Sequence, residues 1–219
     1  MVTYEQVKHN EEINAYIKCA DEVLESIGYT EHSYAHVTRA AEGASRILKG
    51  LGYSDRYAEL AKIAGYMHDI GNVINRNDHA QSGAVMCFRI LDKLGMKAGE
   101  LATVISAIGN HDEGTAVPVN PISAALILAD KSDVRRTRVR NADIASFDIH
   151  DRVNYAVVRS DLHFNQDHTS IILELTIDTE ISPVMNYFEI FLERMMLCAK
   201  SAEKLGVKFE LWINGQKLL

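Results

Sequence analysis

Apolar residues recur every three or four positions along the first two thirds of the chain, the spacing that places side chains on one face of an α-helix. The first such segment runs from Asn10 to Ile27 and is ended by Gly28. No sequence repeat relates these segments, which predicts a helical bundle and not a solenoid. Five further segments with this pattern are expected to be helices: residues 34–51, 54–70, 77–94, 97–110 and 122–134.

The pattern changes after about residue 140. Residues 154–164 and 169–178 are rich in β-branched and aromatic side chains, and their alternation predicts a hairpin of two strands. Ser182 and Pro183 favour the start of a long amphipathic helix, with Ser182 as the capping residue, and Gly206 ends it.

A third strand is predicted from Val207 to Ile213, and Asn214-Gly215 predicts a turn into a short last strand. The expected fold class is therefore α+β. We expect an all-α domain over residues 1–140, followed by a small ββαβ-type unit over residues 141–219 whose helix covers one face of its sheet.

The composition is that of a folded globular protein, because 47% of the 219 residues are hydrophobic, 24% are charged and only three are proline. The longest apolar run, Ala124 to Ala129, is far shorter than the roughly 20 residues that cross a bilayer. The acidic start, Met1 to Glu5, does not resemble a signal peptide. These features predict a cytoplasmic protein without a membrane span.

Charge and cysteine content exclude further classes. A net charge of −7 argues against general binding to nucleic acids or to membrane surfaces, so an anionic substrate has to be held locally. The three cysteines are widely spaced and form no Cys-x-x-Cys pair, which argues against a disulfide framework or a thiolate zinc site.

Histidine and aspartate residues lie in or at the ends of several predicted helices. Asp130 stands in an apolar helix, where an ionised carboxylate costs several kcal/mol unless it is paired or binds a cation. Imidazole and carboxylate groups together are the ligands of divalent ions such as Zn, Mn and Fe. One cluster would account for all of the following residues: His32 or His36, His68, Asp69, His79, His111 and Asp130.

The alternative is that each histidine is simply packed or exposed, as lone helix histidines more often are. That interpretation suits four histidines on weakly patterned segments, and we assign them no role: His9, His150, His163 and His168. For the other positions, this alternative would require several unrelated histidines and aspartates to lie at helix ends by chance.

The order of His36, His68-Asp69 and Asp130 resembles the HD-domain superfamily of metal-dependent phosphohydrolases. The segment Gly-Tyr-Met-His-Asp-Ile-Gly at residues 65–71 matches the signature of that superfamily, and His-Ser-Tyr-Ala-His at 32–36 and Leu-Ala-Asp-Lys at 128–131 match its flanking motifs. The similarity covers roughly residues 20–140. It implies a helical fold in which His36, His68, Asp69 and Asp130 hold one metal ion.

His79 and His111 look like the additional ligands of members with two metals, in which Asp69 would bridge the ions. Cyclic-dinucleotide phosphodiesterases and symmetrical diadenosine polyphosphate hydrolases have such histidines, but the Gly-Tyr-Pro segment that marks the former is missing after Glu113. Many relatives carry lysine where this chain has Asn72. The expected cofactors are two divalent ions from the group Fe, Mn, Zn, Ni and Mg.

Four arginines lie between residues 135 and 140, directly after the last proposed ligand. They could form a solvated face, but guanidinium groups also bind phosphate through two hydrogen bonds at once. We expect Arg135 to bind a substrate phosphate, with Lys131 and Ser132 as further candidates.

These observations predict an enzyme that cleaves a phosphate ester or phosphoanhydride, with a nucleotide or dinucleotide as the expected substrate. Asp69 and His32 are the predicted catalytic residues, and His32 is expected to give a proton to the leaving oxygen. The alternative is a nucleotide-binding sensor or scaffold that uses the same metal site and basic segment without turnover. Its C-terminal unit would be a partner surface, and a homodimer is compatible with either function. A purely structural metal site is disfavoured, because oxygen donors and open positions suit catalysis better.

Overall fold

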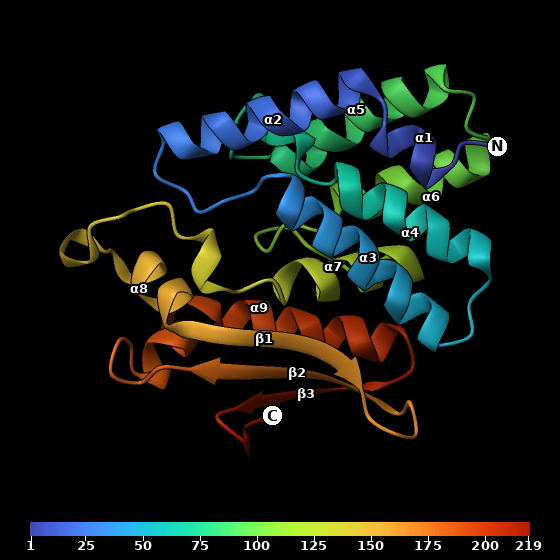
Figure 1. Ribbon diagram of the computed structural model, residues 1–219. Coiled ribbons are helices and arrows are strands. Elements are labelled where there is room, and N and C mark those ends of the chain that lie inside the picture. The colour runs from blue at the N-terminus through green and yellow to red at the C-terminus, as the bar shows by residue number, and fades with distance from the viewer.

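Seven helices make up the first two thirds of the chain in the computed structural model, which describes residues 1–219 (Figure 1). A short 3₁₀ helix, η1 (Ile70–Val73), follows the fourth of them. The seven helices are α1 (Tyr4–Lys8), α2 (Glu11–Ser26), α3 (Tyr34–Gly50), α4 (Asp55–Met67), α5 (His79–Lys93), α6 (Ala98–Gly109) and α7 (Pro121–Lys131).

Side chains with short polar groups start the helices that matter for the site. Ser33 accepts a hydrogen bond from the backbone N–H of Ala35 at the start of α3, and Ser54 does the same for Tyr57 in α4. At α7, Asn120 forms a capping box with Ser123. The six helices predicted from apolar spacing are confirmed, with small shifts of their ends.

The last third of the chain forms a four-stranded sheet with helices on one side, so the predicted α+β class is confirmed. The elements are two 3₁₀ helices, η2 (Arg136–Arg138) and η3 (Ile144–Ser146), then α8 (Ile149–Ala156), β1 (Val157–Phe164), β2 (Ser170–Ile177), α9 (Val184–Lys204), β3 (Lys208–Ile213) and β4 (Gln216–Lys217). β1 and β2 pair antiparallel, β2 and β3 pair parallel, and β3 and β4 pair antiparallel. A parallel pair needs a crossover, and α9 supplies it.

Two local predictions in this unit were wrong. Residues 154–156 were expected in the first strand but end α8, because Asp148 caps that helix and Val153 and Ala156 are buried. Ser182 was expected to cap α9, yet Pro183 takes the capping position and the Ser182 hydroxyl is buried without a partner. Helices α1 and α8 were not predicted, because five and eight residues are too short for a clear period.

Helix α9 lies between the sheet and α7, so the two parts of the chain share their interior (Figure 1). One hydrophobic cluster contains Leu128 of α7, Phe191 of α9 and Leu173 of β2. The domain boundary at residue 140 therefore stays a prediction. None of the helices has the length and apolar composition that crossing a membrane requires.

The tightest helix contact is that between α3 and α4, which form an antiparallel pair (Figure 1). A Cβ atom added to Gly65 of α4 would lie 2.6 Å from Cα of Ala41 in α3. Glycine at this position therefore sets the distance between the two backbones. Because the pair is antiparallel, His36 in the first turn of α3 lies beside His68 at the end of α4, with ring centroids 5.2 Å apart.

We expect Gly65→Ala to lower the free energy of unfolding by about 1–3 kcal/mol, because backbone atoms of α3 have to move. Gly99→Ala in α6 is the matched control, since no atom lies within 4 Å of the added Cβ and alanine favours the helix. Thermal or urea unfolding of both variants checks this. Equal stability of Gly65→Ala and the natural chain would show that the close contact has no energetic consequence.

Candidate metal centre

Four histidines and two aspartates meet at one end of the helical part. His36 lies in α3, His79 begins α5, and Asp130 lies in α7, whereas the other three follow the ends of helices. All six side chains are buried. The three that follow helix ends are His68 and Asp69 after α4, and His111 after α6.

The first group of atoms surrounds one oxygen of Asp69. Nε2 of His36 is 3.5 Å and Nε2 of His68 is 3.1 Å from Oδ2 of Asp69. The same nitrogens lie 3.3 Å and 3.7 Å from Oδ1 of Asp130. Ligand atoms of His36, His68 and Asp130 are all within 4.8 Å of one another, which is close enough to hold a metal ion.

The second group of atoms faces the other oxygen of Asp69. Nε2 of His79 is 3.4 Å and Nε2 of His111 is 3.7 Å from Oδ1 of Asp69, and the two nitrogens are 3.2 Å apart. His68, Asp69 and His111 form a second set that could hold a metal. The two oxygens of Asp69 thus point to two different sets of histidines.

The other ring nitrogen of each histidine fixes its tautomer. Nδ1 of His68, His79 and His111 lies 2.8, 2.9 and 2.6 Å from a backbone carbonyl oxygen. Nδ1 of His36 lies 2.8 Å from Oδ2 of Asp133. Because these oxygens only accept hydrogen bonds, each Nδ1 carries a proton, so in the neutral ring that binds a metal each Nε2 presents its lone pair to the centre.

Convergent lone pairs require a cation. Nε2 of His36 and of His68 are buried and have no hydrogen-bond partner, although buried polar atoms are nearly always paired. Imidazole nitrogen and carboxylate oxygen are ligands of transition-metal ions and zinc. The residues of this site therefore fit a divalent metal ion.

The electrostatics of the centre agree with that fit. Burial raises the pKa of Asp69, but the charge of His68 and hydrogen bonds from neighbouring imidazoles outweigh it and hold the pKa well below its usual range. For His36, burial and the Arg138 charge lower the pKa, but the nearby carboxylates of Asp130, Asp133 and Asp69 outweigh them and raise it to about 10. The centre therefore attracts positive charge, a proton or a metal, between its ionised carboxylates.

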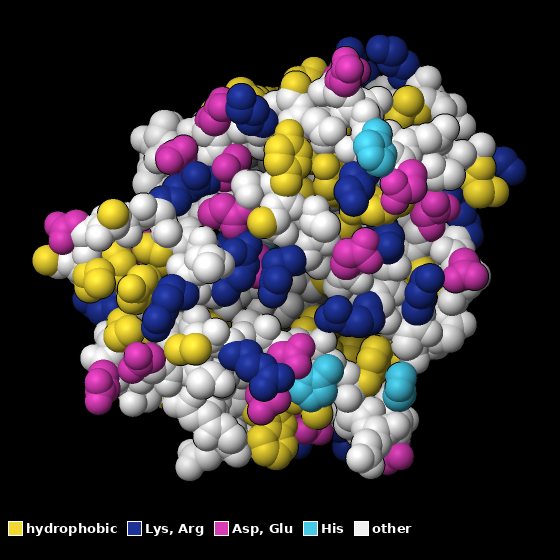
Figure 2. Space-filling model, viewed as in Figure 1, with side chains coloured by type: hydrophobic (Ala, Val, Ile, Leu, Met, Phe, Trp, Pro, Cys, Tyr) yellow, Lys and Arg dark blue, Asp and Glu magenta, His cyan; other side chains and the backbone are white.

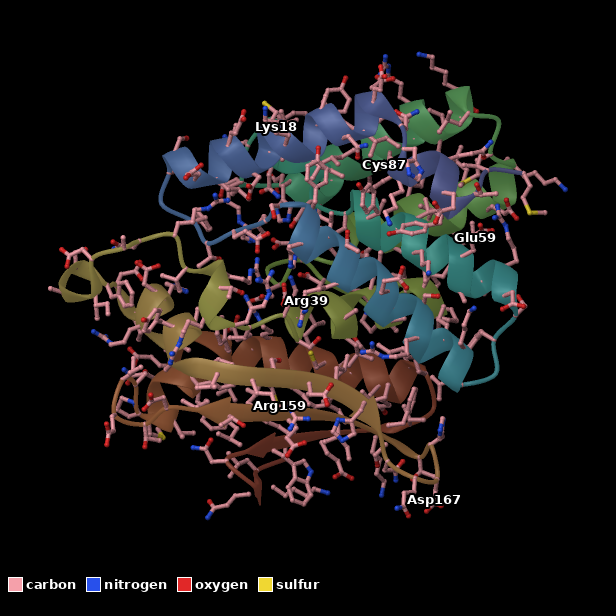
Figure 3. The ribbon with its side chains drawn as sticks, in the orientation of Figure 1. Lys18, Arg39, Glu59, Cys87, Arg159 and Asp167 are labelled. Carbon is pink, nitrogen blue, oxygen red and sulfur yellow. The ribbon has the colours of Figure 1, made fainter.

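Asp133 is a functional residue that the sequence did not single out. Its Oδ1 accepts a hydrogen bond from Nε of Arg135 at 2.9 Å and lies 3.3 Å from Nε of Arg39, which Figure 3 labels on α3. Burial raises the pKa of Asp133, but the hydrogen bond from His36 and the charges of His36, Arg138 and Arg135 outweigh it and hold the pKa below its usual range. Its position three residues after Asp130 is the signal that could have indicated it.

The three predicted substrate-binding residues are already engaged within the chain. Nζ of Lys131 is buried and lies 2.8 Å from Oδ2 of Asp130. The Ser132 hydroxyl donates to the carbonyl of Ala129, and Nη2 of Arg135 donates to Oε2 of Glu31 at 2.8 Å. None of the three lines the pocket described next.

A pocket of about 540 Å³ adjoins the centre. Its wall includes Arg76, whose Nη1 lies 3.2 Å from Nε2 of His79, and His32, whose ring centroid is 5.3 Å from that of His36. Arg138 and Arg194 also line it, and neither was predicted as a binding residue. Basic side chains gather across the middle of this face, between the helices and the sheet (Figure 2).

His32 faces this pocket in a defined protonation state. Burial and the Arg138 charge lower the pKa of His32 well below its ordinary value, so the ring is neutral. Nδ1 lies 2.6 Å from the carbonyl of Thr30 and so carries the proton, which leaves Nε2 as an acceptor. The role of His32 as proton donor stays a prediction, because the ring first has to take up a proton.

Comparison with known proteins adds two findings. The model of a family described as HD domain matches residues 33–143, slightly more than half of the chain. An uncharacterised protein of Methanocaldococcus jannaschii is 24% identical over 159 residues, which cover 63% of this chain. The chain spans 61% of the length of that curated relative.

We expect Asp133→Asn to lower the affinity for a divalent ion about 10- to 100-fold, because the neutral amide orients His36 less firmly and makes it a poorer ligand. Asp92→Asn, on the exposed side of α5, is the control and should bind metal like the natural chain. Competition against a chromogenic chelator measures both affinities. Unchanged affinity in Asp133→Asn would contradict the role of Asp133.

Proposed function

Because the chain belongs to the HD domain family, whose superfamily comprises metal-dependent phosphohydrolases, we propose that it hydrolyses a phosphate ester or phosphoanhydride of a nucleotide or dinucleotide. The observation that carries this proposal is the convergence of four imidazole lone pairs and two carboxylates beside a pocket that is lined by three arginines.

Two divalent ions are proposed. His36, His68 and Asp130 would hold one, His79 and His111 the other, and Asp69 would contribute one oxygen to each. Divalent ions bound in this way polarise phosphoryl oxygens and lower the pKa of a bound water. The ion is proposed to be Fe, Mn, Zn, Ni or Mg, and the ligand set of nitrogen and oxygen favours the transition metals.

Arg138 is the protein group best suited to bind the substrate phosphate. Its Nε and Nη1 donate to the carbonyls of Glu31 and Asp133 at 2.9 and 2.7 Å, so its guanidinium plane is fixed. Nη2 makes no hydrogen bond within the chain, and the residue lines the pocket. A fixed, buried guanidinium with a free donor binds an anion without losing further side-chain freedom.

Arg135 remains a second proposal for the same role, with Lys131 and Ser132. It differs from Arg138 in that its guanidinium donates to two carboxylates, Glu31 and Asp133, which already balance its charge. A phosphate would have to displace one of them. The size of the pocket supports a nucleotide, since cavities of about 300–1,000 Å³ enclose ligands of that size.

The proposed function predicts two metal ions per chain by elemental analysis of protein that has been loaded with Mn²⁺ or Fe²⁺ under reducing conditions. His79→Ala and His111→Ala should each retain one ion, because only one set of ligands is broken. Asp69→Asn should lose both metal and turnover of nucleotides while circular dichroism shows the helices intact.

Full turnover by Asp69→Asn would contradict the assignment of the centre. If the natural chain binds only one ion and His79→Ala binds one as well, the two-metal proposal fails and a mononuclear phosphohydrolase remains. If the chain binds a nucleotide but releases no phosphate with any of the metals tested, the result would instead support the nucleotide-binding sensor.

A matched pair of substitutions separates the two arginines. Arg138→Lys should lower kcat/KM about 10- to 100-fold and weaken inhibition by inorganic phosphate by a similar factor, because one charge-assisted hydrogen bond is lost. Arg135→Lys should change both much less. Steady-state kinetics on metal-loaded protein measures both effects, and an equal or larger loss in Arg135→Lys would assign the phosphate to Arg135.

A further inference from the structure

The pocket beside the metal centre is built largely from residues outside the region that matches the HD family. The family match ends at residue 143, whereas α8 contributes Asp151 and Asn154 to the wall, its capping residue Asp148 also lines it, and α9 contributes Phe191 and Arg194. The loop from Ile27 to Thr30 lies before the matched region. Most of the pocket wall therefore lies outside the region that the family model describes.

Hydrogen-bond acceptors gather in the part of the wall that α8 provides. Asn154 is 5% exposed, and its Nδ2 donates to the carbonyl of His150 while its Oδ1 accepts no hydrogen bond within the chain. Asp151 accepts from Asn141 at 3.3 Å through one oxygen only. This amide oxygen and the two carboxylates line the pocket with acceptor capacity that the chain does not use, so they suit a ligand that donates hydrogen bonds.

Flat groups line the same pocket. The guanidinium carbon of Arg76 lies 5.4 Å from the ring centroid of Tyr29, and that of Arg194 lies 4.0 Å from the ring centroid of Phe191. All four residues belong to the wall. Phe191 is 3% exposed beneath Arg194, whereas Tyr29 is 43% exposed, so the surfaces open to a ligand are the Tyr29 ring and the two guanidinium groups. Aromatic rings and guanidinium planes are the surfaces on which nucleobases stack in proteins.

The charge along the hollow changes sign. Toward the metal centre, Arg76 and Arg194 are paired with Asp112 and Glu113, which also line the wall, whereas Arg138 donates only to backbone carbonyls and adds a positive charge there. A second hollow of about 390 Å³ continues the pocket past Asp148 and Asp151. Arg140 in this second hollow is paired with Asp21 and Glu25. The far part therefore repels a second phosphate and accepts an uncharged group that donates hydrogen bonds.

We propose, on the basis of the function proposed above, that this part of the pocket binds the nucleoside of a nucleoside monophosphate. The phosphate lies toward the metal centre and Arg138, the base stacks on the aromatic and guanidinium surfaces, and the hydroxyl and amino groups donate to Asp151, Asp148 and Asn154. Asp148 and Asp151 both line the two hollows, and Asp151 is the main specificity residue because Asp148 already accepts the backbone N–H of Asp151 as the cap of α8.

The test compares adenosine 5′-monophosphate, ribose 5-phosphate and p-nitrophenyl phosphate as substrates of the metal-loaded protein. The natural chain should prefer the nucleotide. Asp151→Asn should raise KM for the nucleotide about tenfold with kcat retained, so that the ratio of kcat/KM for the nucleotide to that for p-nitrophenyl phosphate falls by the same factor. Asp167→Asn in the exposed β1–β2 turn, labelled in Figure 3, is the matched control.

Calorimetry with adenosine on metal-free protein decides the proposal independently of turnover. Adenosine should bind the natural chain and Asp167→Asn equally, and Asp151→Asn about tenfold more weakly. Equal affinity in Asp151→Asn, or no binding at all, would overturn the nucleoside site, as would equal hydrolysis of ribose 5-phosphate and the nucleotide. If no compound releases phosphate but adenosine binds as expected, the hydrolase proposal fails and the nucleoside site stands.

Discussion

The metal centre depends on one constraint: each of four buried imidazoles has to direct Nε2 toward the space between the carboxylates. In the neutral ring the proton is then on Nδ1, and this N–H needs a hydrogen-bond acceptor. His68, His79 and His111 find this acceptor in the carbonyl three residues earlier, at Gly65, Arg76 and Ile108. Gly65 and Ile108 lie in the last turns of α4 and α6, where carbonyls lack a partner within the helix. A histidine just past a helix end therefore has its tautomer fixed by its own chain. His36 lies in the first turn of a helix, and only the side chain of Asp133 can fix it.

Asp133 in turn explains the arginines that follow it. A carboxylate buried at this depth costs several kcal/mol unless cations and hydrogen bonds compensate it. Arg135 and Arg39 contact its Oδ1, and Arg138 donates to its backbone carbonyl. Part of the basic segment therefore stabilises the residue that orients His36. Arg138 differs from its neighbours in keeping one donor free toward the pocket.

The sequence was informative wherever a short stretch of chain determines the result. Apolar spacing located the six longer helices of the first part, and the types of residue at His68, Asp69 and Asp130 indicated a metal, because few other environments suit such groups in apolar helices. It did not indicate that Arg138, Arg194 and Asp151 line one pocket, since their positions depend on how the loop after α2, the helix α8 and the helix α9 come together. No periodicity within one segment reports a contact between residues 31 and 138. Lys131 was predicted to contact the substrate. Its burial follows from the packing of several elements, which its position in the sequence does not reveal.

Lys131 shows how the C-terminal unit enters the electrostatics of the centre. Its amine lies 2.8 Å from Oδ2 of Asp130, so that Oδ1 alone faces His36 and His68, and 3.6 Å from Oε1 of Glu113. The same oxygen of Glu113 accepts a hydrogen bond from Nε of Arg194 at 2.7 Å. Charges thus alternate from a proposed metal ligand to the wall of the pocket. Removing the buried amine of Lys131 would leave Asp130 without its cation, at a cost of about 3–5 kcal/mol. Arg194 of α9 is therefore linked to Asp130 through Glu113 and Lys131, so a change of charge in α9 alters the electrostatics of the centre.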